Sequence, residues 1–156
     1  MSRAVAVGVI ITSIGLRGTG LATAAGDDNN VLTRRPVMHS ILLVDDEPEI
    51  LAAWRLILEN EGYEVQCASN GVEAVERVTA GVPDLIITDW MMPLMDGAEL
   101  CRRLRTMPAI ANVPILIHTA VPPPMIEVRD WDVCLRKPVG AELFLTTVGQ
   151  LCSRRR

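Results

Sequence analysis

Four short polar groups in the 156-residue sequence could carry out chemistry together: Asp45-Asp46, Asp89, Thr119 and Lys137. Carboxylate oxygens are the ligands that Mg²⁺ prefers, and this ion keeps open positions for phosphate oxygens. A carboxylate can also act as a nucleophile and become an acyl phosphate. An ammonium group neutralises charge on a transferring phosphoryl group, and a hydroxyl can donate a hydrogen bond to it. These residue types therefore indicate metal-assisted phosphoryl chemistry, provided that the fold brings them together.

Each of these residues also has an ordinary structural explanation. Acidic residues before a helix complement its dipole, and an aspartate after a strand is commonly a turn former. Lys137 is harder to explain in this way, because it is the only lysine beside fourteen arginines. A bias of composition accounts for the arginines, whereas the one retained lysine indicates a need for a compact charge on a flexible stem.

Short apolar runs alternate with helical patterns through most of the chain. Apolar residues at helical spacing predict helices from Pro48 up to Gly62, from Asn70-Gly71 up to Gly81, over 97–107 and over 141–152. Strands alternating with helices form right-handed βαβ units and a mainly parallel sheet. We therefore expect an α/β domain over about residues 39–152, with a five-stranded, doubly wound sheet. Its strands are predicted at Ile41–Val44, Tyr63–Ala68, Leu85–Thr88, Ile115–Thr119 and Val133–Leu135.

The polar groups all follow predicted strands. Asp45-Asp46 comes after the first strand and Asp89 after the third, while Thr119 ends the fourth and Lys137 follows the fifth. In such sheets, ligands bind outside the carboxyl ends of the strands. Independent explanations would not place the only lysine at the same edge as the carboxylates, so the sequence predicts one shared site there.

Composition excludes several classes of protein. The sequence is 49% hydrophobic and 22% charged, which argues against disorder, collagen and coiled coil. No apolar run reaches the length of a membrane span. The net charge is −4, and residues 39–156 alone carry 17 acidic and 11 basic side chains. This acidic body favours a cation or a basic partner and argues against direct DNA binding.

The four cysteines contain no C-x-x-C motif and no paired histidine spacing, which argues against a zinc site. We expect free thiols and a cytoplasmic location, with a disulfide framework as the alternative.

The first 38 residues form a separate segment. Arg3, the apolar stretch Ala4–Ile11 and Ala22-Thr23-Ala24 fit the template of a signal peptide. Arg17 interrupts that template, and Met38 lies just before the first strand. A mis-assigned upstream extension or a disordered tail is therefore the other interpretation. Residues 153–156 are expected to be a solvated basic tail with no effector domain after it.

The polar groups lie in motifs that resemble the receiver domain of two-component response regulators, as in CheY-like single-domain proteins. The D-x-x-M-P-x-M-D-G run is the most specific of them, and the resemblance covers about residues 39–152. It implies the flavodoxin-like fold of CheY. The matching runs are Val44-Asp45-Asp46-Glu47-Pro48, Asp89-Trp90-Met91-Met92-Pro93-Leu94-Met95-Asp96-Gly97, Thr119-Ala120 and Lys137-Pro138.

The resemblance also implies roles for individual residues. Asp89 would accept a phosphoryl group from a sensor histidine kinase. Asp46, Asp89 and the Met91 backbone carbonyl would bind Mg²⁺ directly, and Asp45 would do so through water. In addition, the resemblance assigns the switch hydroxyl to Thr119 and contact with the phosphoryl group to Lys137. The phosphorylated domain would act through protein–protein interaction, without turnover of an external substrate.

The sequence departs from the family on the signalling side. Cys134 stands where the family usually has Tyr or Phe, and Val139 where Phe commonly follows Lys-Pro. Pro122-Pro123-Pro124 cannot lie inside a helix, so we expect the fourth helix to be short, displaced or missing. Apolar Met91 and Val121 cannot orient an attacking water, which predicts slow loss of the phosphoryl group.

Two other functions remain open. A phosphatase with an aspartyl nucleophile is one, although the haloacid-dehalogenase-like D-x-D spacing is missing from Asp45-Asp46-Glu47. A receiver-shaped interaction scaffold that works without phosphorylation is the other, favoured by Cys134 and the proline run.

Overall fold

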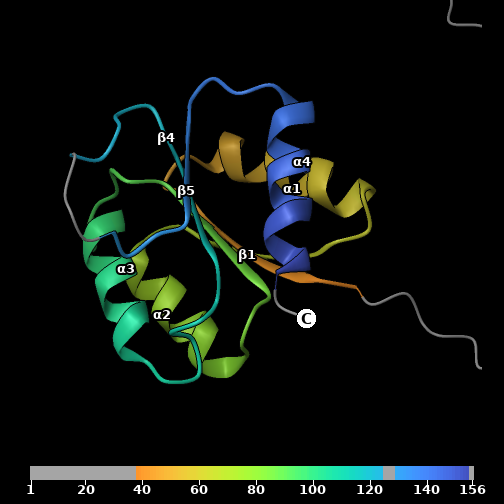
Figure 1. Ribbon diagram of the computed structural model, residues 1–156. Coiled ribbons are helices and arrows are strands. Elements are labelled where there is room, and N and C mark those ends of the chain that lie inside the picture. Colours follow the sequence, from red (N-terminus) through yellow and green to blue (C-terminus); the bar gives the residue numbers. More distant parts are fainter. Residues whose placement is uncertain (1–37, 125–128, 155–156) are drawn as a thin grey trace, which may run out of the picture. The chain divides into compact units, whose positions relative to one another are not determined.

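A computed structural model of the protein describes residues 38–124 and 129–154. Strands and helices alternate from residue 40 to residue 119, after which a fifth strand follows the fourth with no helix between them in the described residues. The five strands form one parallel sheet in the order β2-β1-β3-β4-β5 (Figure 1). This confirms the predicted doubly wound α/β fold. The strands are β1 (Ser40–Val44), β2 (Glu64–Ala68), β3 (Leu85–Thr88), β4 (Ile115–Thr119) and β5 (Val133–Arg136), and the helices are α1 (Pro48–Asn60), α2 (Gly71–Ala80), α3 (Gly97–Thr106) and α4 (Ala141–Ser153).

Helices cover both faces of the sheet, with α2 and α3 on one side and α1 and α4 on the other (Figure 1). Successive residues of a strand point to opposite faces. Leu42 and Val44 therefore join the core beneath α2 and α3, whereas Ile41 and Leu43 join the core beneath α1 and α4. Burial on both faces explains why the central strands are continuous apolar runs.

Local signals set the starts of three helices. Pro48 occupies the first turn of α1, where its missing N–H costs nothing. Asn70 caps α2 and Asp96 caps α3, each accepting a hydrogen bond from a backbone N–H three residues on. Helix α1 ends at Asn60, slightly before the predicted boundary at Gly62. Gly62 has a φ of 87°, a left-handed conformation that glycine adopts readily after a helix.

The core beneath α1 and α4 contains a histidine beside two stacked aromatic rings, those of Trp54 and Phe144. The His118 ring centroid lies 5.4 Å from that of Trp54 and 5.3 Å from that of Phe144. His118 is 4% exposed, and its Nε2 atom has no hydrogen-bond partner among the described residues. Burial, followed by the positive charge of Lys137, lowers the pKa of His118 to about 4. The ring is therefore neutral at neutral pH.

The β4–β5 connection has no helix in its described residues, 120–124 and 129–132. Asp132 anchors it instead, because one carboxylate oxygen accepts hydrogen bonds from the Ile115 N–H at 2.8 Å and from Arg105 at 3.1 Å. Arg105 also donates to the carbonyls of Ala111 and Val113. The absence of a helix there agrees with the expectation from the proline run, within those residues.

The four cysteines are free thiols, as predicted. None of the helices in residues 38–124 and 129–154 combines the length and apolarity needed to cross a membrane. The interpretations of residues 1–37 as a signal peptide or an extension lie outside the described residues, as do the last two arginines of the basic tail.

Candidate functional site

Backbone hydrogen bonds hold the predicted site residues at the carboxyl edge of the sheet. The Asp45 N–H donates to the Ala68 carbonyl at 3.1 Å, and the Asp89 N–H donates to the Val44 carbonyl at 2.9 Å. The Lys137 N–H donates to the Thr119 carbonyl at 2.8 Å. These bonds extend the sheet one residue beyond its strands, so that the positions of the side chains follow directly from the strand register.

Lys137 brings three carboxylates together. Its Nζ atom lies 2.6 Å from Asp45 Oδ2, 3.3 Å from Asp89 Oδ2 and 3.7 Å from Glu47 Oε1. The Asp45 and Asp89 side chains are 3% and 9% exposed, whereas Glu47 is 59% exposed at the rim. One ammonium against three carboxylates leaves a formal charge of −2, which a divalent cation would neutralise.

The electrostatics of the site follow from its burial. Burial raises the pKa of the Asp45 carboxyl, and the hydrogen bond from Lys137 only partly offsets this effect. Burial also acts to lower the pKa of Lys137, but its hydrogen bond to Asp45 and the charges of Asp45 and Asp89 outweigh burial and raise that pKa. The lysine is thus firmly charged, while Asp45 lies in a site that disfavours its own charge and would gain from a further cation.

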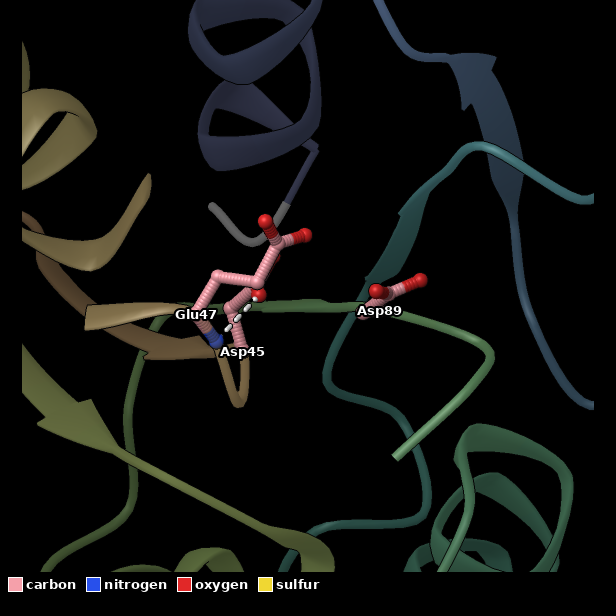
Figure 2. Close-up of side chains that lie close together, drawn as sticks. All are labelled: Asp45, Glu47 and Asp89. Atoms are coloured by element: carbon pink, nitrogen blue, oxygen red, sulfur yellow. Dashed lines mark hydrogen bonds between the residues drawn. The ribbon is translucent and has the colours of Figure 1, made fainter. Parts of the chain in front are cut away.

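The carboxylates of Asp45, Glu47 and Asp89 could share such a cation. One oxygen of each lies within 4.8 Å of the others, and Figure 2 shows Asp45 and Glu47 beyond β1 facing the segment that carries Asp89. A purely oxygen donor set fits a hard ion such as Mg²⁺. Asp46 is exposed and is not in this cluster of described residues, so its direct ligation of Mg²⁺ stays a prediction.

Glu47 is the site residue that the sequence reasoning missed. Its backbone N–H donates to Asp45 Oδ1 at 3.0 Å (Figure 2), which folds the acidic run back on itself. The available signal was the third acidic residue in Asp45-Asp46-Glu47, two positions after the buried aspartate.

Asp89 has two oxygens in different surroundings. Oδ1 accepts hydrogen bonds from the backbone N–H groups of Trp90 at 2.5 Å and Met91 at 3.4 Å. Oδ2 faces Lys137. The two amides therefore orient the carboxylate and leave Oδ2 as the oxygen on the side of the ammonium.

The segment after Asp89 passes very close to the start of α3. A Cβ added to Gly97 would lie 2.4 Å from the Asp89 carbonyl oxygen and 2.8 Å from the Trp90 Cα. The Gly97 N–H donates to the Trp90 carbonyl at 2.9 Å. Only glycine fits this close approach, which explains the Asp-Gly that closes the D-x-x-M-P-x-M-D-G run.

Within the described residues, the Thr119 and Met91 side chains make no hydrogen bond to the carboxylates. Thr119 is 1% exposed, and its Oγ1 atom accepts a hydrogen bond from the Val121 N–H at 3.3 Å. The side chains of Met91 and Val121 are 60% and 53% exposed. Both are apolar and belong to the segments that follow β3 and β4.

Comparison with known proteins supports the same interpretation. The family model of the response regulator receiver domain matches residues 41–147. The chain is 38% identical over 106 residues to the alkaline phosphatase synthesis transcriptional regulatory protein PhoP of Bacillus subtilis, covering 68% of this chain and 41% of that protein. It is 43% identical over 84 residues to the phosphate regulon transcriptional regulatory protein PhoB of Rhizobium meliloti, covering 54% and 37%. The chain therefore spans about two fifths of the length of these relatives.

Solved structures agree over nearly their whole length. The chemotaxis response regulator CheY4 of Vibrio cholerae superposes with a TM-score of 0.67 and 30% identity, covering 73% of this chain and 98% of that one. The receiver domain of a signal transduction histidine kinase from Syntrophus aciditrophicus gives a TM-score of 0.68 and 33% identity, covering 76% and 92%. The acidic pocket with its lysine, the sheet order and the matched family model lead to one conclusion: the chain belongs to the response regulator receiver domain family.

Proposed function

We propose that the protein is a phosphoacceptor of a two-component phosphorelay and that Asp89 accepts the phosphoryl group from a sensor histidine kinase. The contact of Lys137 with both Asp45 and Asp89 carries this proposal, because it places a buried cation beside the one aspartate whose other oxygen is fixed by two backbone amides.

Asp89 Oδ2 is the proposed nucleophile. The new bond joins Oδ2 to phosphorus, the bond between phosphorus and the donor's imidazole nitrogen breaks, and that nitrogen keeps the electron pair. The Trp90 and Met91 amides hold Oδ1 so that Oδ2 faces Lys137. Lys137, already 3.3 Å from Oδ2, stabilises the negative charge of the phosphoryl oxygens.

Mg²⁺ would supply positive charge to the phosphoryl oxygens. The residues that would hold it are Asp89, Asp45 and Glu47, together with Asp46 and the Met91 backbone carbonyl that the family resemblance adds. The raised pKa of Asp45 and the formal charge of −2 support a divalent cation in this place.

Thr119 is the proposed switch hydroxyl. Its Oγ1 atom accepts the Val121 N–H, and its own proton is available to donate to a phosphoryl oxygen. We propose that the side chain turns to do so, which would release the Val121 amide and transmit phosphorylation to residues 120–124. Cys134 is exposed, and a small thiol cannot gate the pocket in the way that an aromatic ring does.

The phosphorylated domain would then act by binding another protein, without direct DNA binding. Four free thiols, including exposed Cys134, support a reducing location such as the cytoplasm. We also propose that residues 39–152 are the receiver domain, preceded by a separate segment and followed by a basic tail.

A phosphorylation-independent scaffold is the second candidate. The observation that favours it is the altered signalling side, where Cys134 replaces the aromatic residue and the described β4–β5 connection has no helix. On this hypothesis Lys137 would serve only to neutralise the buried carboxylates.

Phosphotransfer from a small-molecule donor with Mg²⁺ tests the two candidates. The native chain and the control Glu76→Gln, which changes an exposed residue of α2, should each incorporate one acid-labile phosphoryl group, and Asp89→Asn should incorporate none. Equal labelling of Asp89→Asn, or no labelling of the native chain, would contradict the proposal. Continued release of phosphate from an ester substrate would indicate the phosphatase instead.

A further inference from the structure

A pocket of about 300 Å³ lies beside the phosphoacceptor loop, between the start of α3 and the β4–β5 connection. We call it the tryptophan pocket. It does not include the acidic cluster at the carboxyl edge, and of its lining residues only Trp90 has a role in the proposed phosphotransfer, through its backbone N–H to Asp89 Oδ1. Residues that line it are Trp90, Asp96, Glu99, Arg102, Asp130 and Trp131.

Two indole rings form one wall of the tryptophan pocket. The ring centroids of Trp90 and Trp131 lie 5.2 Å apart with an interplanar angle of 68°. Both side chains are half-buried and pack against the core beneath α2 and α3, so their positions are fixed before any ligand binds. The face of an indole attracts a cation that stacks on it, and tryptophan is the strongest of the aromatic residues in this respect.

The remaining walls carry an excess of negative charge. Asp96, Glu99 and Asp130 oppose the single guanidinium of Arg102, which is already paired with Glu99. Asp96 uses Oδ1 to cap α3. Asp130 has neither a hydrogen bond nor an ion pair within residues 38–124 and 129–154. The pocket therefore combines two aromatic faces with a carboxylate that has no cationic partner in the described part of the chain.

We propose that the tryptophan pocket binds an arginine side chain of a partner protein. A guanidinium is planar and weakly hydrated, so that it can stack on an indole while its N–H groups donate to carboxylates on either side. The ammonium of lysine is a strongly hydrated point charge and matches this arrangement less well. The acidic body of the chain, with 17 acidic and 11 basic residues over 39–156, would attract a basic segment to this surface.

The pocket is connected to the phosphoacceptor through the backbone. The Trp90 N–H donates to Asp89 Oδ1, and the Trp90 carbonyl accepts from Gly97 at the start of α3. A phosphoryl group on Asp89 would therefore act on the ring that forms the pocket wall. By linkage, phosphorylation and arginine binding change each other's equilibrium by the same factor. This linkage rests on the proposed function, whereas the binding of arginine does not.

Titration of ¹⁵N-labelled protein with N-acetyl-arginine amide tests the binding. The indole N–H signals of the tryptophans report it. We expect saturable shifts at Trp90 and Trp131. The matched neutral probe, N-acetyl-citrulline amide, should bind at least about tenfold more weakly, because it keeps the shape and loses the charge. Trp131→Ala and Asp130→Asn should each weaken binding about fivefold. Trp54→Phe, on the other side of the sheet, should not change it.

Several outcomes would overturn the assignment. Equal affinity for N-acetyl-citrulline amide would show that positive charge is not needed for binding. Equal affinity for N-acetyl-lysine amide would show that the pocket does not prefer a guanidinium to an ammonium. If Trp131→Ala proves unfolded by circular dichroism, Trp131→Phe and Asp130→Asn decide the question, and native affinity in both would contradict the proposal.

A second titration uses protein phosphorylated by the small-molecule donor. An affinity change of at least about twofold supports the linkage, and no change contradicts the linkage alone. If Asp89 cannot be phosphorylated, the first titration still tests the pocket, so the two failures are distinguishable.

Discussion

The carboxyl edge of the sheet and the β4–β5 connection are neighbours in sequence and fold, but they are built in different ways. At the edge, the side chains of Asp45, Asp89 and Lys137 are 3%, 9% and 13% exposed, and each backbone is tied to the adjoining strand. In the connection, Val121 is 53% exposed, and Asp132 and Trp131 provide the anchoring contacts. The difference indicates that the strand register holds the chemical groups, while a few side chains hold the segment that would respond to them.

Replacing Lys137 with arginine should produce the largest change at the carboxyl edge. The variant keeps the charge, but a wider, planar guanidinium cannot lie 2.6 Å from Asp45 Oδ2 and 3.3 Å from Asp89 Oδ2 in the same buried space. We expect phosphoryl incorporation about a hundredfold slower, comparable to the loss of one electrostatic stabiliser of a transition state. The control is Arg136→Lys at the adjacent exposed position. A native rate in Lys137→Arg would show that the single lysine has no special role.

Replacing His118 with leucine should stabilise the fold, and more so in acid. The folded-state pKa of about 4 lies below the ordinary value of 6.5, so the unfolded chain binds a proton between these values when the folded chain does not. Stability is therefore lost as pH falls through this window. At about pH 5 the free energy of unfolding of the native protein should be about 2 kcal/mol lower than at neutral pH. The variant His118→Leu should not show this decrease.

Urea unfolding near pH 7.5 and pH 5 measures this difference. The gap between the native protein and His118→Leu should widen in acid, and His118→Phe, which keeps a ring beside the stacked Trp54 and Phe144, should show the same trend. A gap that does not depend on pH would mean that the histidine is protonated in the folded state.

Replacing Asp132 with asparagine should affect the connection and spare the site. The variant weakens the hydrogen bonds to the Ile115 N–H and to Arg105. Because Asp132 is 36% exposed, solvent screens this loss, and we expect the free energy of unfolding to fall by about 1 kcal/mol. Phosphoryl incorporation should remain native, with Asp130→Asn as the control for stability. A slower incorporation would show that the two regions are not independent.

The double variant Met91→Asn with Val121→Glu should have the smallest of these effects. It changes two residues at the border between the two regions. Both native side chains are apolar and more than half exposed in the segments that follow β3 and β4, where polar groups could orient a water towards the acyl phosphate. We expect the phosphoryl group to be lost about threefold faster, measured as decay of labelled protein. An unchanged lifetime would contradict this role for the two side chains.

The strands and the edge they form could be predicted from the sequence because each signal is local. Continuous apolar runs mark strands that are buried on both faces, and polar residues placed directly after them must lie at the carboxyl edge. The positions of their strands alone were enough to predict that Asp89 and Lys137 lie at this edge.

The arrangement of the acidic run could not be predicted in this way. Whether Asp45, Asp46 or Glu47 faces Lys137 depends on backbone dihedrals beyond the strand, and the fold of that turn is set by the Glu47 N–H donating to Asp45. The burial of His118 and the anchoring of Asp132 likewise depend on partners far along the chain. Asp132 and Arg105, for example, are 27 residues apart.

The backbone hydrogen bond between Lys137 and Thr119 limits how the proposed switch could operate. Since the Lys137 N–H is held by the Thr119 carbonyl, β4 cannot slide towards a phosphoryl group without carrying the lysine with it. The hydroxyl can respond independently only by rotation about χ1, and this side chain is 1% exposed and accepts the Val121 N–H. The response to a phosphoryl group would then depend on that rotation and on rearrangement of the segment beginning at Ala120.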